Sequence, residues 1–438
     1  MNFKELRSKY PKFIYEDFKI EEKDGFYICT FYFSIPNLTK FEPIIKFPVG
    51  RKDIDLNFLK YLVFHLGLVE IISYFKCTCS PIIEIKAGYL DENQMEWFKK
   101  LYYYGLGEFR YINNIDCSID EFVNITCISD KKERFNINYN GKGNLIAVGG
   151  GKDSIVSIEL LKGMDNMCFV INPKDVDKEI CDIANLNYYG VERIIDKKII
   201  ELNSKGFLNG HTPFSAIVAF TSYLACYLNN RKYIILSNEG SANEPTILGT
   251  DINHQYSKTY EFECDFDEYT RKYFNIDIKY FSLLRPIKEI QIAKLFAKYP
   301  KYHQIFRSCN IGSKQNPWVW CCNCPKCLFV FIILRAFISK KEMIKIFGSN
   351  VLDNQKLYQS FLELIGKAET KPFECIGTID EVKYAMNKII ENDDSYLSRI
   401  YKEKYYEPIH LDLTKLYYDN NVIPEYLDIL KEAINDER

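Results

Sequence analysis

Residues 144–161 read NLIAVGGGKDSIVSIELL, and this stretch decides the fold that we expect for the middle of the chain. An apolar, strand-like run over 144–149 leads into three glycines, and a helical pattern begins directly after them. Glycines let backbone amides approach an anion closely, and the start of a helix adds unpaired N–H groups and the positive end of its dipole. The turn at Gly149, Gly150 and Gly151 is therefore predicted to bind phosphate.

The three residues after the glycines carry side chains that suit the same task. Lys152 is expected to supply a mobile cation, Asp153 to hold a magnesium ion between phosphates, and Ser154 to donate a hydroxyl. The alternative is an ordinary glycine turn in which Asp153 or Ser154 caps a helix. The order of strand, glycine turn, Lys-Asp-Ser and helix favours the phosphate site. The glycine spacing fits neither a Walker P-loop nor a dinucleotide fingerprint.

Strands and helices alternate around this turn. The strand-like segments are 144–149, 167–173, 191–196 and 232–239, and the helical ones are 153–162, 177–186 and 213–228. This alternation predicts an α/β fold whose parallel sheet is covered by helices on both faces, with ligands beyond the carboxyl ends of the strands.

The segments in front of this region follow a different order. Strand-like stretches at 26–49 and 81–87 and helical ones at 55–76 and 92–106 predict an α+β domain. We therefore divide the chain into an N-terminal α+β domain (1–140), an α/β domain that contains the glycine turn (141–300), a short segment that contains a cluster of cysteines (301–345) and a C-terminal helical lobe (346–438).

Composition argues against several classes of protein. The formal net charge is −2 and no block of Lys or Arg stands out, so non-specific binding of nucleic acid is not expected. The first residues lack the apolar core of a secretory signal, and the longest apolar stretch, 327–334, is too short to span a bilayer. Most of the fifteen cysteines are scattered singly, which fits a reducing cytoplasm. We expect a cytoplasmic protein that binds neither nucleic acid nor membrane.

One group of cysteines is not scattered. Cys309 precedes the segment 320–327, WCCNCPKC, in which Cys321, Cys324 and Cys327 have C-x-x-C-x-x-C spacing. Four thiolates can satisfy a closed tetrahedral zinc site, which has no open position and is therefore structural. Cys322 is left over. An iron–sulfur cluster and free buried thiols are the alternatives.

The glycine turn resembles the PP-loop, Ser-Gly-Gly-x-Asp-Ser, of the adenine nucleotide α-hydrolase-like enzymes that split ATP into AMP and pyrophosphate. Gly149 stands where that family has its first serine, so one hydroxyl is lost while the backbone N–H remains. One member, 7-cyano-7-deazaguanine synthase, combines the loop with segments similar to RPIKEI (285–290), SCN (308–310) and the cysteine cluster. That enzyme lacks the front domain.

Longer strings resemble a different family more closely. They occur in the order VGGGKDSIVSIELL (148–161), NGHTPFSAI (209–217), LSNEGSANEPT (236–246), NHQYSKT (253–259), WCCNCPKCLFV (320–330) and KPFECIG (371–377). They look like the UDP-N-acetyl-α-D-muramoyl-L-alanyl-L-glutamate epimerases, and the likeness covers nearly the whole chain. The resemblance implies inversion of the terminal L-glutamate of UDP-MurNAc-L-Ala-L-Glu, with ATP cleaved to AMP and pyrophosphate. The expected cofactors are therefore ATP, Mg²⁺ at Asp153 and structural Zn²⁺ at the four cysteines.

Within these strings, polar side chains are candidates for acid–base or substrate-binding roles. The candidates for the catalytic site are His211, Glu239, Asn243, His254 and Lys258. Arg285 and Lys288 are expected to reach phosphates or the UDP group, and Lys371 and Glu374 to close over the site. Each has a structural alternative as a cap, a polar turn or a solvated charge. The proton-removing base stays open, with Cys264 and Cys375 also among the candidates.

Two other hypotheses stay open. In the first, the same adenylation acts on another acceptor, as in nitrile formation on a deazapurine or thiolation of a tRNA base. In the second, the chain is a zinc-knuckle binding module with a degenerate nucleotide site. The near-neutral charge disfavours thiolation, and the presence of Asp153 and Ser154 disfavours a degenerate site.

Overall fold

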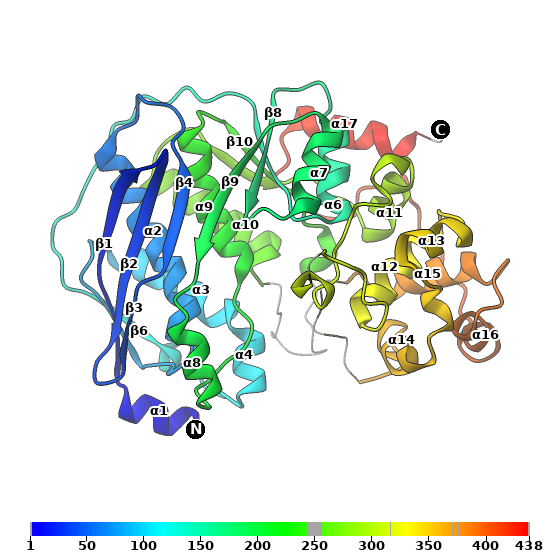
Figure 1. The fold of residues 1–438 in the computed structure, drawn as a ribbon, viewed down its shortest axis with the longest axis horizontal. Coiled ribbons are helices and arrows are strands. Elements are labelled where there is room, and N and C mark those ends of the chain that lie inside the picture. Colours follow the sequence, from blue (N-terminus) through cyan, green and yellow to red (C-terminus); the bar gives the residue numbers. More distant parts are fainter. Residues whose placement is uncertain are drawn as a thin grey trace. The chain divides into compact units, whose positions relative to one another are not determined.

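The computed structural model describes residues 2–243, 256–315, 317–369, 372, 374 and 376–436 (Figure 1). The chain forms two compact units, and each is assembled from three separate parts of the sequence. Unit 1 comprises Met1–Lys142, Tyr189–Ile234 and Thr250–Tyr280, and unit 2 comprises Gly143–Tyr188, Ile235–Gly249 and Phe281–Arg438. The predicted division at 140, 300 and 345 stays a prediction.

Unit 1 combines antiparallel and parallel strand pairs with helices. Its elements are α1 (Phe3–Lys9), β1 (Lys12–Lys23), β2 (Phe26–Ile35), β3 (Thr39–Phe41), β4 (Ile44–Pro48), α2 (Leu56–Phe75), β5 (Ile82–Ile85), α3 (Glu92–Gly105), α4 (Gly107–Ile112), α5 (Ile119–Phe122), β6 (Asn124–Cys127), β9 (Tyr188–Ile194), α8 (Lys198–Ser204), α9 (Phe214–Leu228), the 3₁₀ turn η2 (Tyr256–Lys258) and α10 (Tyr260–Tyr273). The hydrogen-bonded order of its strands is β9-β4-β2-β1-β5-β6, with β3 on β2. The β1–β5 and β5–β6 pairs are parallel, and the β1–β2, β2–β4 and β4–β9 pairs are antiparallel.

Strand β1 was not predicted. Its outer half is charged and exposed, with the sequence KIEEK, so it lacks the apolar alternation of a half-buried strand. The available signal was the Asp24-Gly25 turn, in which both residues have positive φ (52° and 79°), as a tight hairpin requires. Pairing along nearly the whole of β2 holds the polar end of β1 in the sheet.

Helix α2 is the central helix of unit 1 and packs against β1, β2 and α9. A side chain at Gly67 would collide with the Tyr15 ring and with Phe31, so glycine allows the helix to lie close to the sheet. This 20-residue helix is long and apolar enough to span a membrane, although polar residues interrupt it and its uninterrupted apolar runs are shorter than 327–334. However, 83% of its most apolar window is buried inside the protein, as expected of a core helix.

Unit 2 contains the glycine turn and the cysteines. Its elements are β7 (Asn144–Ala147), α6 (Lys152–Leu160), β8 (Asn166–Ile171), α7 (Asp175–Ala184), β10 (Tyr233–Leu236), the 3₁₀ turn η1 (Gly240–Asn243), β11 (Lys279–Ser282), α11 (Glu289–Ala297), α12 (Pro325–Arg335), α13 (Lys340–Phe347), α14 (Tyr358–Leu364), α15 (Ile379–Ile389), α16 (Tyr396–Ile400) and α17 (Pro424–Asn435). Strands β10 and β11 begin in unit 1 and end in unit 2. The strand order is β11-β10-β7-β8, and β7 and β8 are parallel.

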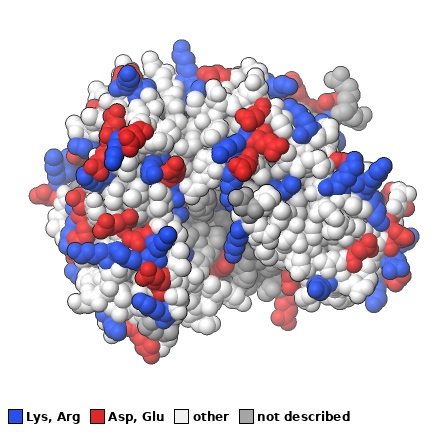
Figure 2. Space-filling model, in the orientation of Figure 1, with Lys and Arg blue, Asp and Glu red and all other residues white. Residues whose placement is uncertain are grey.

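The predicted α/β class is confirmed, whereas the sheet pairing is mixed rather than wholly parallel. Residues 191–194 of the segment 191–196, expected in a parallel sheet, belong to β9, which pairs antiparallel with β4. Helix α9 packs against α2 in unit 1. Helices α6 and α11 pack against each other in unit 2, and this contact positions the site described next. On the face shown in Figure 2, acidic and basic side chains are interspersed.

Candidate active site and metal centre

The glycine turn joins the end of β7 to the start of α6. Gly151 is the N-cap residue of α6. Because glycine has no side chain, it does not accept a hydrogen bond from the first N–H groups of the helix. Gly150 has φ of +75°, and a Cβ there would lie 2.9 Å from the Trp318 ring. At Gly149, in contrast, a Cβ would meet no atom within 4 Å. The turn is therefore closely packed at its centre and open beside Gly149, where an anion can approach its backbone.

Lys152 forms the centre of a buried charge cluster. Its ammonium donates to the carboxylates of both Asp153 and Glu289. The side chains of Lys152 and Glu289 are 5% and 4% exposed, whereas that of Asp153 is 35% exposed. Lys152 was expected to be a mobile cation. Instead, packing of α6 on α11 holds its ammonium against Glu289.

The charges in this cluster shift one another's protonation. Burial lowers the pKa of Lys152, but the carboxylates of Asp153 and Glu289 outweigh it and the net pKa is raised. Burial also raises the pKa of Glu289, and Asp153 and Glu239 add to this effect while Lys152 opposes it. Lys326 also opposes it, so three carboxylates and two ammonium groups interact in this cluster, with Lys152 between Asp153 and Glu289.

Glu289 is the site residue that the sequence reasoning missed. The segment 285–290, RPIKEI, was singled out, but only Arg285 and Lys288 were assigned a role. Lys288 instead donates to the Tyr418 hydroxyl (3.1 Å) and lies over the rings of Tyr417 and Tyr418. The available signal for Glu289 was its place at the first position of α11, where carboxylates are common.

Glu239 follows β10, where the sequence placed it, and is 7% exposed. Its carboxylate accepts a hydrogen bond from Ser241 Oγ (2.8 Å), and its carbonyl accepts one from Arg285 Nη1 (3.1 Å). Arg285 is fully buried, so it stabilises the segment that carries Glu239. Ser237 Oγ, just before it, lies 2.8 Å from Ser157 Oγ of α6. The segment after β10 is thus tied to the helix that begins at the glycine turn.

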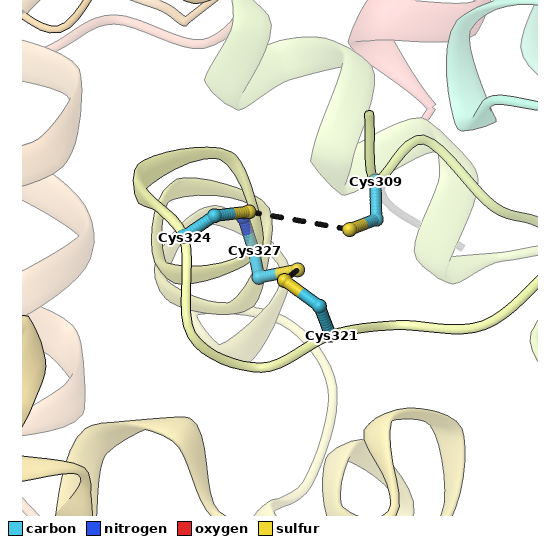
Figure 3. A group of neighbouring side chains, drawn as sticks. All are labelled: Cys309, Cys321, Cys324 and Cys327. Atoms are coloured by element: carbon cyan, nitrogen blue, oxygen red, sulfur yellow. Dashed lines mark hydrogen bonds between the residues drawn. The ribbon is translucent and has the colours of Figure 1, made fainter. Parts of the chain in front are cut away.

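The four cysteines form a compact group from two parts of the chain (Figure 3). All four sulfurs lie within 4.8 Å of one another, with 4.0 Å between Cys309 and Cys324 and 3.7 Å between Cys321 and Cys327. Four sulfurs bound tetrahedrally to zinc at about 2.3 Å would be about 3.8 Å apart. The donor set therefore fits a closed zinc site.

Backbone N–H groups donate hydrogen bonds to two of these sulfurs. Gly312 N–H donates to Cys309 Sγ (3.1 Å), and Cys327 N–H donates to Cys324 Sγ (3.4 Å) at the start of α12. Cys322 has positive φ, and its thiol donates to the Phe347 carbonyl (3.2 Å), outside the group. The structure thus separates the extra cysteine from the four candidate ligands.

The cysteine group and the glycine turn are linked through the segment that carries Cys309. Arg307 N–H donates to the Gly150 carbonyl (2.8 Å), and the Trp318 indole, which contacts Gly150, donates to the Cys309 carbonyl (2.9 Å). A metal that fixes Cys309 would therefore also fix one wall of the turn.

His211 and Lys258 belong to unit 1. His211 Nδ1 lies 3.8 Å from a carboxylate oxygen of Glu108. Lys76 donates to the carbonyl of Gly210 and to Thr212 Oγ1 (2.7 Å), so it holds the chain on both sides of His211. Burial, and next the charge of Arg193, lower the pKa of Lys76 to about 8. Sequence patterns gave no hint of this contact.

The remaining predicted site residues lie elsewhere or outside the described part of the chain. His254, Lys371 and Cys375 lie outside the described residues, as does the side chain of Asn243. Glu374 accepts a hydrogen bond from Asn310, next to Cys309. Lys258 ends η2, and Cys264 lies on α10.

Known proteins that this chain resembles identify its family. Residues 4–283 match the MurL N-terminal domain, and residues 305–407 match the MurL C-terminal domain. The chain belongs to the MurL family. The MurL C-terminal match contains all four clustered cysteines, whereas Arg285 to Ile290, with Glu289, lie between the two matched regions.

Three relatives carry the name UDP-N-acetyl-alpha-D-muramoyl-L-alanyl-L-glutamate epimerase. The protein of Xanthomonas oryzae pv. oryzae is 34% identical over 330 residues, which are 73% of this chain and 72% of the relative. That of a Micromonospora species is 34% identical over 334 residues (75% and 74%), and that of Salinispora tropica is 32% identical over 332 residues (74% and 72%). Membership of the MurL family therefore rests on most of the chain, as the resemblance in the sequence predicted.

Proposed function

We propose that this MurL-family chain is a cytoplasmic epimerase that inverts the terminal L-glutamate of UDP-MurNAc-L-Ala-L-Glu and cleaves ATP to AMP and pyrophosphate. The names of the relatives support the epimerisation and its place in peptidoglycan precursor synthesis. The observation that carries the ATP dependence is the Lys152–Asp153–Glu289 cluster at the glycine turn. We assign the turn to the PP-loop class on this basis.

Activation of the carboxylate makes the inversion chemically feasible. The α-proton beside an ionised carboxylate is very weakly acidic, because its removal would place two negative charges side by side. Attack of the glutamate carboxylate on the α-phosphorus of ATP forms an acyl-adenylate and releases pyrophosphate. The α-proton then leaves to a base, a proton returns to the opposite face, and water releases AMP and the D-isomer.

The residues of unit 2 would bind the phosphates of ATP. The backbone N–H groups of Gly149, Gly150 and Gly151 would face the pyrophosphate, with Ser154 beside them. Asp153 and Glu289 would hold Mg²⁺, a hard cation that prefers carboxylate oxygens and neutralises the phosphate charge. Lys152 would then balance both carboxylates and the phosphate.

The proton-transfer residues are the open part of the proposal. His211 and Glu239 are our candidates for removing or returning the proton, while Asn243, His254 and Lys258 would bind the substrate. Arg285, which is fully buried, would position the segment of Glu239, and Lys288 would reach a phosphate. The four cysteines Cys309, Cys321, Cys324 and Cys327 would hold a structural zinc.

The test is turnover of the defined substrate. The purified chain is incubated with UDP-MurNAc-L-Ala-L-Glu, ATP and Mg²⁺, followed by acid hydrolysis and chiral analysis of the glutamate. D-Glutamate and AMP are expected, and neither is expected in the Asp153→Ala variant. Inversion at full rate without ATP would overturn the mechanism, and production of ADP would show that the turn does not act as a PP-loop.

A further inference from the structure

Unit 1 contains a pocket that the sites above do not use. It encloses about 570 Å³, a size typical of small-molecule sites, and all of its lining residues belong to unit 1. Its walls come from five parts of the chain: Phe18 of β1, helix α2, the segment 86–94 before and at the start of α3, the irregular segment 129–135 after β6, and 272–275 at the end of α10. We call it the unit 1 pocket.

Aromatic rings form much of the wall. Tyr61 and Phe64 of α2 face the pocket together with Phe135 and Tyr273. The ring centroids of Tyr61 and Phe135 are 5.0 Å apart, so Phe135 anchors the irregular segment 129–135 to helix α2. Flat aromatic surfaces of this kind bind planar ligand groups such as nucleobases by stacking.

Polar side chains at the start of α3 line the unit 1 pocket beside the aromatic rings. Asp91 is the N-cap of α3, and its carboxylate accepts a hydrogen bond from the Tyr273 hydroxyl (3.0 Å). Gln94, one turn further, is buried and donates to the Tyr269 hydroxyl (2.9 Å). Gln94 Oε1 also accepts a hydrogen bond from Asp91 N–H (3.1 Å), so Gln94 holds this wall in place. The partly exposed carboxylate of Asp91, beside the aromatic rings, is the group that can accept a hydrogen bond from the edge of a base.

Charge around the pocket is strongly unbalanced. Its lining includes six cationic and two anionic side chains: Lys60, Lys86, Lys131, Lys132, Arg134 and Lys272 against Asp91 and Glu133. Lys86 pairs with Glu16 (3.0 Å). In the described part of the chain, no ion pair within 4 Å involves Lys60, Lys131, Lys132 or Arg134. The chain as a whole has a formal net charge of −2, so this concentration of cations is local.

We propose that the unit 1 pocket binds a nucleoside diphosphate, with the base against the aromatic wall and the diphosphate against Lys60 and Arg134. The identity of the nucleoside as uridine rests on the proposed function, in which the substrate carries UDP and the glycine turn of unit 2 takes ATP. Aromatic surface alone would accept many apolar ligands, and cations alone would accept any phosphate. Their combination selects a ligand that has both parts.

The experiment measures binding of UDP to the full chain by calorimetry, without turnover. The test variant is Lys60→Glu/Arg134→Glu, which changes two exposed side chains, and Lys52→Ala is the matched control at an exposed lysine outside the pocket. We expect UDP to bind the unchanged chain, Lys52→Ala and Asp153→Ala alike. Binding to the double variant should be at least about a hundredfold weaker, at about tenfold for each lost charged contact.

The other ligands identify the source of any binding. Pyrophosphate should bind much more weakly than UDP, and equal affinity would overturn the role of the aromatic wall. In Asp153→Ala, in which the glycine turn is altered, ATP should not displace bound UDP. If ATP displaces UDP and binds more tightly than UDP, the choice of UDP as the ligand is wrong. Unchanged UDP binding in the double variant, or no binding to the unchanged chain, would overturn the pocket itself. The experiment measures binding and not inversion. Its result therefore tests the pocket even if the chain does not epimerise glutamate.

Discussion

The ammonium of Lys152 is bound to the carboxylate of Glu289, although the two residues are 137 positions apart in the chain and both are almost fully buried. Lys152 opens α6 directly after the glycine turn, and Glu289 opens α11. Two helix starts therefore meet at one charge cluster. This arrangement gives the phosphate-binding turn a second carboxylate beside Asp153.

The first prediction concerns Glu289. In Glu289→Gln the amide keeps the size of the side chain and a hydrogen bond to Lys152, but it cannot ligate Mg²⁺ as a carboxylate does. We expect substrate-dependent exchange of pyrophosphate into ATP to fall by about a hundredfold or more. The circular dichroism spectrum should stay unchanged. Glu381→Gln is a poor control because Glu381 is buried too, so Glu363→Gln, at a partly exposed position of α14, serves instead. Exchange at the unchanged rate in Glu289→Gln would remove Glu289 from the site.

The second prediction concerns the metal. The unchanged chain and Cys322→Ser should each contain about one zinc per molecule, because one closed site takes four thiolates. Cys324→Ser should lose the zinc and melt several degrees lower, since metal binding is coupled to folding. Elemental analysis and thermal unfolding measure the two effects. Iron with visible absorbance would replace the zinc assignment by an iron–sulfur cluster.

The same variants test the link between the metal and the turn. Arg307 and Trp318 connect the segment of Cys309 to Gly150. Chelation of the zinc should therefore weaken ATP binding as well as stability, while Cys322→Ser should bind ATP normally. Normal ATP affinity in a folded, zinc-free chain would show that the link has no functional effect.

The third prediction concerns Lys76, which holds the chain on both sides of His211. Lys76→Met removes the hydrogen bonds to Gly210 and Thr212, so we expect the rate of inversion to fall about tenfold or more. Formation of AMP should continue, because the glycine turn is intact. His211→Asn should have the same pattern if His211 carries the proton. Lys9→Met, at an exposed lysine of α1, is the control. Loss of AMP formation in Lys76→Met would instead assign the region to substrate binding or activation.

The fourth prediction concerns acid stability. His65 is fully buried on α2, and burial lowers its pKa to about 4, well below the ordinary value. The unfolded chain therefore binds a proton at this residue between about pH 6.5 and 4, and the folded chain does not. This contribution to stability is complete above pH 6.5 and is lost as the pH falls toward 4, and it amounts to on the order of 3 kcal/mol.

Denaturant unfolding at pH 7 and at pH 4 measures this effect. The unchanged chain should lose about 3 kcal/mol more than His65→Gln over the interval, because glutamine does not titrate. All carboxylates titrate in both proteins and cancel in the comparison. An equal loss in the two proteins would mean that His65 is protonated in the folded state.

The fifth prediction follows the proton. In heavy water the D-glutamyl product should carry deuterium at its α-carbon, since inversion passes through a deprotonated intermediate. Without ATP, or in Asp153→Ala, neither inversion nor exchange should occur. Mass spectrometry of the product measures the incorporation. Inverted product without deuterium would require one shielded base that returns the same proton.

Local patterns in the sequence determined much of this protein. The glycine turn between β7 and α6 was predicted because its glycines and the following helix are contiguous. The four cysteines were predicted as one group, since three share a short segment and Cys309 is close in sequence. The epimerase family was predicted from long strings, and its membership is confirmed.

Only the tertiary structure decided which distant segments meet. The contact between Lys152 and Glu289 depends on packing of α6 on α11, and the contact of Lys76 with the chain around His211 joins residues 136 positions apart. The antiparallel pairing of β9 with β4 and the assembly of the unit 1 pocket from five segments also depend on such distant contacts. The spacing of apolar residues along the sequence shows which face of a helix or strand is buried, because those residues lie together on that face. It does not report which partner covers the face, because that choice depends on the packing of the whole unit.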